Sequence, residues 1–164
     1  MSGANGRADP RDVSAPDHSA LVYDLQIQPA ASRFSPKKIK QLVSELEVPF
    51  DESAIDWRVT NTAKGERRGQ VVPYADPRAY TDRLNTLLTP AGWTRKYAVH
   101  TSANFERAKD KKIVAKVLVT CELTIFGVGS HSATGEEFAD NEDALTAAEA
   151  QAFKRAAACF ALGR

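Results

Sequence analysis

The chain has 164 residues, of which 43% are hydrophobic and 26% charged, and its formal net charge is +1. This length suits one domain with a core large enough to fold unaided. No apolar run is long enough to cross a bilayer, and the N-terminus lacks the charged-then-apolar layout of a secretory signal, so we expect a cytoplasmic protein. Cys121 and Cys159 are too few for a disulfide framework and lie in apolar sequence, which predicts buried free thiols. The three scattered histidines have no zinc-binding spacing.

The first fifty residues contain one predicted helix. Residues 1–20 are rich in Gly, Asp, Pro, Ser and Ala without periodicity, which predicts a disordered tail, and residues 21–34 contain a candidate docking strand. Ser35 is a typical N-cap with Pro36 in the first turn, and Pro49 ends the helix. Its apolar positions follow the helical repeat: Ile39, Leu42, Val43 and Leu46.

A hairpin and a second helix are predicted next. Residues 55–60 and 69–74 are expected to pair as antiparallel strands around a polar turn. Asp76 followed by Pro77 opens a helix that ends before Gly92. The apolar face of this helix comprises Tyr80, Leu84, Leu87 and Leu88.

Two long strands follow, at residues 93–105 and 113–125, and residues 128–134 are predicted to add a third. Both long strands alternate with period two, so the odd-numbered side chains should be buried and the even-numbered ones should face solvent or a partner. Trp57 and Trp93 are able to stack bases, but their apolar neighbours favour burial in the core.

The last helix is alanine-rich and is predicted to follow Asn141 as its N-cap, after a loop at residues 135–142. One stripe is apolar: Leu145, Ala148, Ala152, Phe153, Ala156, Cys159 and Phe160. Lys154 points away from this stripe among small residues, and Arg155 lies on its shoulder. A lone lysine on a floor of methyl groups suits the close approach of a long polyanion. The alternative is a core helix with a solvated Lys-Arg pair.

Charge is segregated along the sequence. Residues 58–116 contain thirteen lysines and arginines against five acids, whereas residues 117–150 contain seven acids and no lysine or arginine. A folded surface with this segregation carries a strong local field despite a neutral total, unless folding brings the two sets together.

No catalytic constellation is present. The sequence has no phosphate-binding loop, nucleophile elbow or compelling Cys-His pair, and the acids of residues 136–143 are better explained as a solvated loop than as metal ligands. We therefore expect a binding protein without metal or cofactor. The order of elements predicts one α+β domain over residues 35–164: a curved antiparallel β-meander packed against a long C-terminal helix, with a β-hairpin and a helix before it.

Several of these segments also occur, in the same order, in a known family. Residues 152–164, Ala-Phe-Lys-Arg-Ala-Ala-Ala-Cys-Phe-Ala-Leu-Gly-Arg, resemble its signature. The other matching pieces are Val-Pro-Phe at 48–50, Ile-Asp-Trp-Arg at 55–58, residues 74–88, Ala-Gly-Trp at 91–93 and Gly-Val-Gly at 127–129. Together they make residues 39–164 similar to the Rad52/22 family of single-strand annealing proteins, in its bacterial, DNA-damage-response-A-like branch.

The resemblance implies an ATP-independent protein that binds single-stranded DNA and anneals complementary strands in repair and recombination. It implies a closed homo-oligomeric ring, associated with the nucleoid, with other repair proteins as candidate partners. The resemblance also implies that the strand runs in a groove with its backbone inward and its bases outward. A positive track that binds phosphates and leaves the bases accessible meets the physical need of such binding.

Four site residues are carried over by position. The resemblance implies that Arg58 contacts the DNA backbone, that Lys154 lies on the groove floor with Arg155 beside it, and that Lys112 belongs to a second, outer DNA site. In the family's eukaryotic members, the segment before the last helix supplies lysines to that outer site. Here the corresponding residues 136–143 are acidic.

Two further lysines follow from strand geometry alone. Lys96 and Lys116 lie at even positions of the long strands, so they are either part of the same positive surface or ordinary solvated lysines. Two other functions also remain open. One is a small hot-dog-like enzyme of thioesterase type with an acid such as Glu149 in a subunit cleft, and the other is a protein-interaction scaffold.

Overall fold

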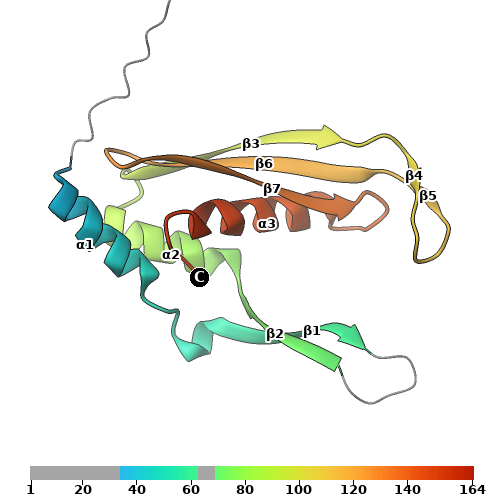
Figure 1. Ribbon diagram of the computed structural model, residues 1–164, viewed down its shortest axis with the longest axis horizontal. Helices are drawn as coiled ribbons and strands as arrows, with labels where there is room; N and C mark the ends of the chain where they lie inside the picture. Colours follow the sequence, from blue (N-terminus) through green and yellow to red (C-terminus); the bar gives the residue numbers. More distant parts are fainter. Residues whose placement is uncertain (1–33, 63–68) are drawn as a thin grey trace, which may run out of the picture. The chain divides into compact units, whose positions relative to one another are not determined.

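The computed structural model describes residues 34–62 and 69–164. The predicted tail at 1–20, nearly all of the predicted segment at 21–34 and the turn of the first hairpin lie outside the described residues. The described chain is α+β, with a three-stranded antiparallel sheet, a separate β-hairpin and a C-terminal helix that lies between them (Figure 1). The predicted fold class is therefore confirmed.

Helix α1 spans Pro36–Glu47 and begins as predicted. The Ser35 hydroxyl accepts a hydrogen bond from the backbone N–H of Lys38 at 3.3 Å, which satisfies one of the free donors of the first turn. The carbonyl groups at the C-terminal end of α1 accept hydrogen bonds from a side chain of the next helix. Arg83 donates to the carbonyl oxygens of Glu45 at 3.3 Å, Val48 at 2.8 Å and Pro49 at 3.2 Å. Arg83 therefore ties the end of α1 to the next helix.

Strands β1 (Ile55–Thr62) and β2 (Gly69–Ala75) form the first hairpin, as predicted. Trp57 pairs with Pro73 and Arg58 with Val72, and the register shifts by one residue after Val59. This irregularity is a β-bulge, which adds a residue to one strand and increases its twist.

Helix α2 spans Pro77–Leu88, again as predicted. The Asp76 carboxylate caps it by accepting a hydrogen bond from the backbone N–H of Arg78 at 2.8 Å. Tyr80 and Leu84 are buried on its inner face.

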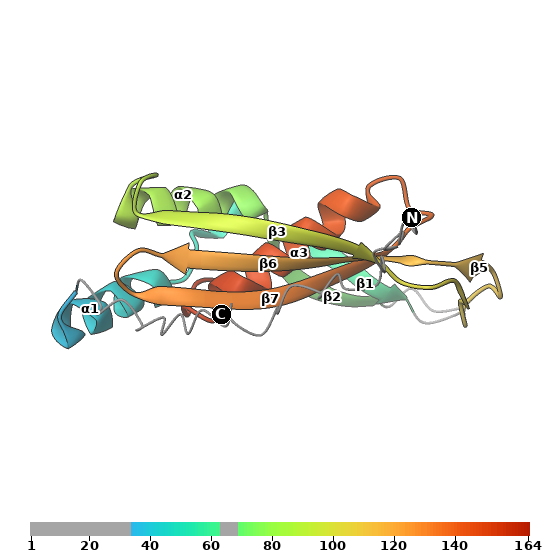
Figure 2. The same cartoon turned by 90° about the horizontal axis from the view of Figure 1, so that it is seen from above.

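The sheet has the strand order β3 (Trp93–Thr101), β6 (Lys116–Ile125) and β7 (Gly129–Phe138), all antiparallel (Figure 2). The expected burial of odd-numbered side chains holds in β6, where Val119, Cys121, Leu123 and Ile125 are completely buried. It holds only in part for β3, an edge strand, where Val99 is 52% exposed. Strand β7 extends four residues further than predicted.

Neither long strand is continuous, contrary to prediction. Two-residue strands β4 (Phe105–Glu106) and β5 (Ile113–Val114) pair with each other in a separate ribbon. The break occurs because Ser102 occupies both backbone groups of Lys116: its N–H donates to the Lys116 carbonyl at 2.9 Å, and its hydroxyl accepts from the Lys116 N–H at 2.8 Å. The alternation of buried and exposed side chains therefore changes phase at the break. Val114 is buried and Ile113 is exposed, whereas the odd-numbered residues are the buried ones in β6.

Helix α3 (Ala144–Ala158) packs on β6 and β7 through an alanine face: Ala144, Ala148, Ala152 and Ala156. The predicted N-cap, Asn141, is wrong. The cap position belongs to Asp143, whose side chain makes no capping bond, and the Asn141 amide donates instead to the Glu137 carboxylate at 2.7 Å. The helix ends at Ala158, so the Cys159 thiol is exposed rather than buried.

The approach of α3 to β7 is close enough to require glycine at position 135. A Cβ atom there would lie 2.1 Å from the Ala148 carbonyl oxygen and 2.7 Å from the Ala152 nitrogen. Both are backbone atoms, so neither can rotate away. The separation of α3 from the sheet is therefore set by the absence of a side chain.

The core forms between α3, β6, α1 and α2, and its largest fully buried side chains include Phe153, Leu46, Leu84 and Leu162. Burial raises the pKa of the Cys121 thiol to about 11. Trp93 is partly buried against this core, and its indole N–H donates to the Asn85 side chain at 2.9 Å. The predicted burial of Trp57 is wrong, because its side chain is 69% exposed on the hairpin. In the described part of the chain, no helix has the length and apolar character needed to span a membrane.

We predict that Gly135→Ala lowers the free energy of unfolding by about 2 kcal/mol or more, because the added methyl group forces two backbones apart. Ser132→Ala, on the same strand at an exposed position, is the matched control and should change the stability by less than about 0.5 kcal/mol. Urea titration of both variants measures the difference. Equal stability of the two variants would show that α3 moves freely relative to β7.

Candidate nucleic-acid interface

Three residues from distant parts of the sequence meet at one aromatic ring. The guanidinium carbon of Arg58 lies 3.2 Å from the centroid of the Tyr74 ring, and the Lys154 Nζ lies 3.8 Å from it. We call Arg58, Tyr74 and Lys154 the Tyr74 cluster. Arg58 comes from β1, Tyr74 from β2 and Lys154 from α3, so the cluster joins the hairpin to the C-terminal helix.

The hairpin register explains why Arg58 and Tyr74 share a face. Arg58 is opposite Val72 and Asp56 is opposite Tyr74, and residues two apart on a strand point to the same side. Lys154 reaches the same ring because it projects from α3 on the side opposite the sheet-packing alanines, as the helical periodicity predicts.

Burial lowers the pKa of Lys154 below its ordinary value, and the neighbouring Arg58 cation lowers it further. The Lys154 Nζ donates a hydrogen bond to the Ala75 carbonyl oxygen at 3.5 Å. Within the described residues, no carboxylate forms an ion pair with either Arg58 or Lys154. Two cations held together without an ion-paired carboxylate favour the binding of an anion.

Asp76 is the acid that opposes this lowering of the Lys154 pKa, and its effect is smaller than those of burial and Arg58. The Asp76 carboxylate is already bound to Arg78, through the backbone N–H at 2.8 Å and the side-chain Nε at 3.0 Å. These bonds lower the Asp76 pKa. Asp76 therefore remains a capping residue of α2 and does not neutralise the Tyr74 cluster.

Arg155 lies outside the Tyr74 cluster and faces β7. Its guanidinium donates to the Thr134 carbonyl at 2.7 Å, and one helical turn earlier the Gln151 side chain accepts from the Glu136 N–H at 2.8 Å. We call Gln151 and Arg155 the edge clip, because they occupy backbone groups on the free edge of β7. Arg155 thus has a structural contact that its sequence did not suggest, and its exposed guanidinium retains further donors.

Lys96 and Lys116 lie on the sheet face opposite α3, since the odd residues of both strands pack against the helix. Lys96 is opposite Glu122, and Lys116 forms an ion pair with Glu136 at 2.8 Å. The structure therefore does not bring them to the Tyr74 cluster.

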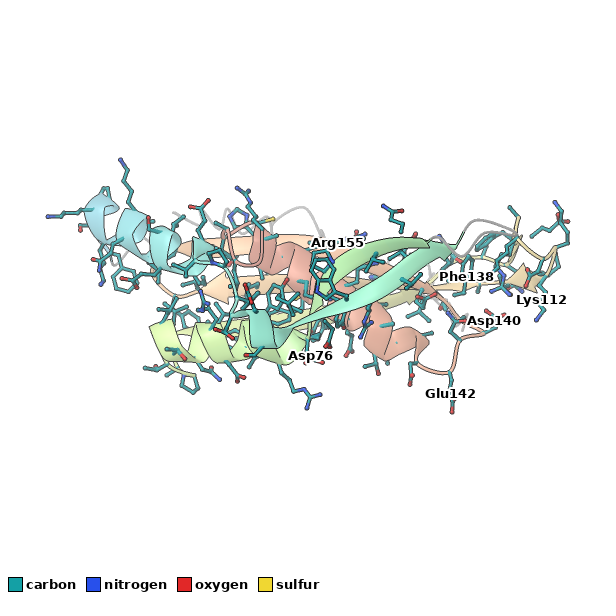
Figure 3. All side chains as sticks on the ribbon, turned by 90° about the horizontal axis from the view of Figure 1, so that it is seen from below. Asp76, Lys112, Phe138, Asp140, Glu142 and Arg155 are labelled. Carbon is teal, nitrogen blue, oxygen red and sulfur yellow. The ribbon has the colours of Figure 1, made fainter. Side chains whose placement is uncertain are left out.

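Lys112 is exposed at the end of the β4–β5 ribbon, in the neighbourhood of Phe138 and Asp140 and away from Arg155 (Figure 3). The acidic segment before α3 neutralises cations in this region. Asp140 and Asp110 both bind Arg107, at 2.9 Å and 2.6 Å, and Glu136 binds Lys116. Folding thus pairs Arg107 and Lys116 with acids, whereas the cations of the Tyr74 cluster have no ion pair within the described residues.

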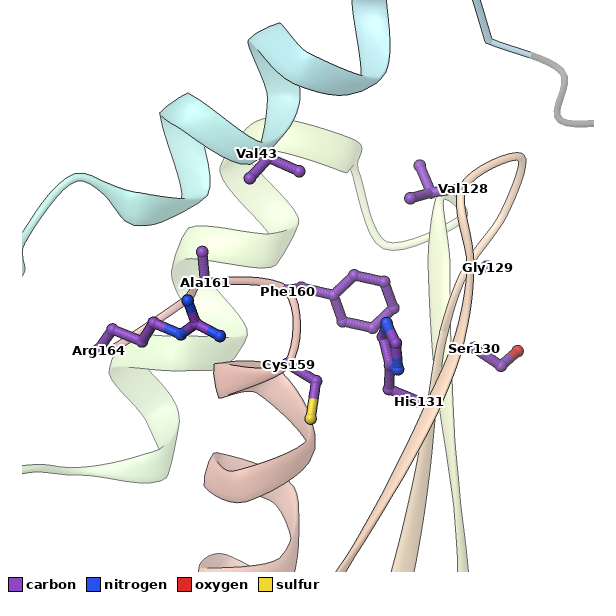
Figure 4. A pocket seen from close by; sticks show the side chains of 9 residues that line it. All are labelled: Val43, Val128, Gly129, Ser130, His131, Cys159, Phe160, Ala161 and Arg164. Atoms are coloured by element: carbon purple, nitrogen blue, oxygen red, sulfur yellow. The ribbon is translucent and has the colours of Figure 1, made fainter. Parts of the chain in front are cut away.

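A separate cavity of about 440 Å³ lies between α1, the start of β7 and the residues after α3 (Figure 4). Its walls include Val43, Val128 and Phe160, and the His131 ring stands edge-on to Phe160 with centroids 4.6 Å apart. The exposed Cys159 thiol also borders it. None of the predicted site residues lines this cavity. Among the described residues, no three His, Cys, Asp or Glu side chains gather as metal ligands would.

Comparison with known proteins finds sequences similar to this chain. The model of the Rad52/22 family of double-strand break repair proteins matches residues 38–164. A curated relative, the single-stranded DNA-binding protein DdrA of Deinococcus deserti, is 27% identical over 127 residues. The match covers 77% of this chain and 57% of the relative, so the chain spans little more than half of that protein's length.

We predict that Lys154→Met retains or exceeds the wild-type free energy of unfolding at pH 7, because the charged lysine is partly desolvated beside Arg58. The folded-state pKa of Lys154 lies below its unfolded value, so the folded state binds this proton less tightly. The stability of the wild type relative to the variant should therefore rise as the pH rises from the lowered pKa toward 10.5.

Urea titrations between pH 7 and pH 10 measure this difference, and Lys40→Met, on the exposed face of α1, controls for the loss of one lysine. The prediction would be contradicted if the free energy of unfolding of the wild type, relative to that of Lys154→Met, fell as the pH rises. Such a fall would mean that folding stabilises the charged amine.

Proposed function

Because the chain belongs to the Rad52/22 family of double-strand break repair proteins, we propose that it binds single-stranded DNA at the Tyr74 cluster and anneals complementary strands without ATP. The observation that carries this proposal is the meeting of Arg58 and Lys154 on one ring, without a carboxylate partner in the described part of the chain. A DNA-binding relative is consistent with it.

The proposed chemistry is electrostatic. Phosphate oxygens accept hydrogen bonds from the Arg58 guanidinium and the Lys154 ammonium group, and the bound phosphates release counterions. The Tyr74 ring is in contact with both cations, so it serves to hold them rather than to stack a base. Bases that are not engaged by the protein remain able to pair, and duplex formation supplies the free energy of annealing. No catalytic residue and no cofactor is required.

Self-association would bury the other face of the hairpin. Trp57 and Pro73 face each other across the strands there, as do Val59 and Val71. Trp57 is 69% exposed, Val59 62% and Val71 49%. An apolar face of this kind on a soluble domain is typical of an interface. We assign it to a second copy of the chain, as part of a homo-oligomeric ring in which the Tyr74 clusters of successive copies follow one another.

The cellular setting of this activity is also a proposal. A protein that anneals strands during repair works on chromosomal DNA, so we propose a cytoplasmic location in association with the nucleoid, with other repair proteins as partners. Thioester hydrolysis by the purified protein, without binding of an oligonucleotide, would instead favour a hot-dog-like enzyme that uses Glu149.

We predict that Arg58→Ala and Lys154→Ala each weaken single-strand binding by about 1 kcal/mol or more at about 0.1 M salt, since each removes a charge-assisted phosphate contact. Fluorescence anisotropy with a labelled oligonucleotide measures the affinity. The wild-type affinity should fall steeply as salt rises, and the slope should be shallower in each variant.

Lys40→Ala removes one positive charge from the exposed face of α1, outside the Tyr74 cluster, and is the matched control. A fluorescence-quenching assay with complementary oligonucleotides and no ATP then tests annealing, which both site variants should slow. Wild-type affinity in both site variants would remove the Tyr74 cluster from the proposed mechanism.

We further predict that Trp57→Glu converts the wild-type assembly into smaller species, because it places a charge in the proposed subunit interface. Light scattering gives the mass of each form. Trp57→Phe keeps the apolar face and should retain the large assembly. A wild type that is already monomeric, or an unchanged assembly in Trp57→Glu, would show that the hairpin face has another role.

A further inference from the structure

Four arginines in the described chain place their guanidinium groups over aromatic rings: Arg58, Arg83, Arg95 and Arg107. A ring covers the flat face of a guanidinium and leaves the N–H donors along its edge free for planar, bidentate acceptors. What occupies that edge therefore indicates what each arginine does.

Two of the four have their edges filled by the protein itself. Arg107 lies 4.8 Å over the Phe138 ring and makes four hydrogen bonds to Asp110 and Asp140, between 2.6 and 3.1 Å. Arg83 lies 5.3 Å over the Phe50 ring and donates to three carbonyls at the end of α1. Arg107 shows directly that such an edge in this protein binds paired anionic oxygens.

Arg95 has the same arrangement without an internal acceptor. Its guanidinium carbon lies 4.5 Å from the Phe153 centroid, 5.7 Å from that of Tyr97 and 6.0 Å from that of Trp93. The side chain is exposed, and within residues 34–62 and 69–164 no hydrogen bond or ion pair to it is observed. The guanidinium group is therefore held beside three aromatic rings, the nearest being Phe153.

The position of Arg95 relates it to the Tyr74 cluster. Arg95 lies on β3 opposite Leu123, on the face of the sheet that packs against α3. The ring beneath it, Phe153, immediately precedes Lys154 in the same helix. Arg58 and Arg95 therefore approach α3 from two different elements, the hairpin and the sheet.

We propose that Arg95 is a phosphate-binding residue for the single strand, so that the bound strand contacts the β3 edge of the sheet as well as the Tyr74 cluster. This inference rests on the proposed function and extends it to a third element. The phosphate oxygens take the in-plane N–H donors of Arg95, as the carboxylates of Asp110 and Asp140 do at Arg107.

We expect Glu149 to limit the affinity of this site. Glu149 lies one helical turn before Phe153 in α3, so it shares a helix face with the ring nearest to Arg95. Arg95 and Glu149 do not form an ion pair in the described structure. A carboxylate beside the phosphate position repels the strand, so its removal should strengthen binding that depends on Arg95.

The test is single-strand affinity as a function of salt for Arg95→Gln, with Lys96→Gln as the matched control. Lys96 is the next residue on β3, carries the same charge and is exposed on the opposite sheet face. We expect Arg95→Gln to weaken binding about tenfold at about 0.1 M salt and to make the slope of log affinity against log salt shallower by about 0.7. Lys96→Gln should change neither quantity by more than about a third of those effects.

Two further variants complete the test. Arg95→Lys keeps the charge but loses the planar fork, so it should recover only part of the affinity. Glu149→Gln should strengthen binding about twofold in the wild-type background and have no effect in Arg95→Gln. Thermal unfolding of each variant confirms that the fold is retained, and loss of the fold in Arg95→Gln would transfer the test to Arg95→Lys and Glu149→Gln.

The outcomes separate this inference from the proposed function. If Arg58→Ala and Lys154→Ala weaken binding while Arg95→Gln leaves affinity and slope at wild-type values, the Arg95 site is overturned and the Tyr74 cluster stands. Equal effects of Arg95→Gln and Lys96→Gln would also overturn it, because they would reflect net charge alone. If none of the variants changes the affinity, the proposed function itself fails.

Discussion

The separation between α3 and β7 is the constraint on which the other contacts depend. Gly135 has no side chain, and the helix face above it consists of alanines, so two backbones meet directly. This close packing fixes the helix in depth and in rotation. As a result Lys154 is directed to the hairpin, Arg155 to the edge of β7 and Phe153 to the core beneath Arg95. Three consecutive residues thereby acquire three different tasks.

The distribution of acidic partners divides the cations of the described chain into two groups. Arg107 and Lys116 have acidic partners from the segment before α3, and this pairing holds the β4–β5 ribbon against the end of β7. Arg58 and Lys154 share an aromatic ring instead. Holding two like charges together costs stability, and a ligand that brings negative charge relieves that cost. A neutral overall charge is therefore compatible with one strongly positive site.

Local sequence signals were enough to predict the helices and strands. Features that depend on tertiary contacts could not be predicted from them. Ser35 and Asp76 cap their helices as expected because capping involves only neighbouring residues. The exposure of Trp57 depends on which hairpin face meets α3, and the break before Lys116 depends on Ser102, fourteen residues away. Periodicity showed only that Lys154 turns from the core, while its link to Arg58 came from family resemblance. Arg95 occupies a strand position that was expected to be buried. A charged residue at such a position, between Trp93 and Tyr97, was the sequence signal that could have drawn attention to it.

The edge clip gives the three-stranded sheet two unlike sides. Arg155 and Gln151 occupy a carbonyl and an N–H of β7 that would otherwise be available to another chain, whereas β3 has one strand neighbour in the described structure. A strand from elsewhere would therefore meet occupied backbone groups on β7 but not on β3 of the described structure. The edge clip thus disfavours extension of the sheet at β7, which opposes open-ended growth of the sheet from one chain to the next.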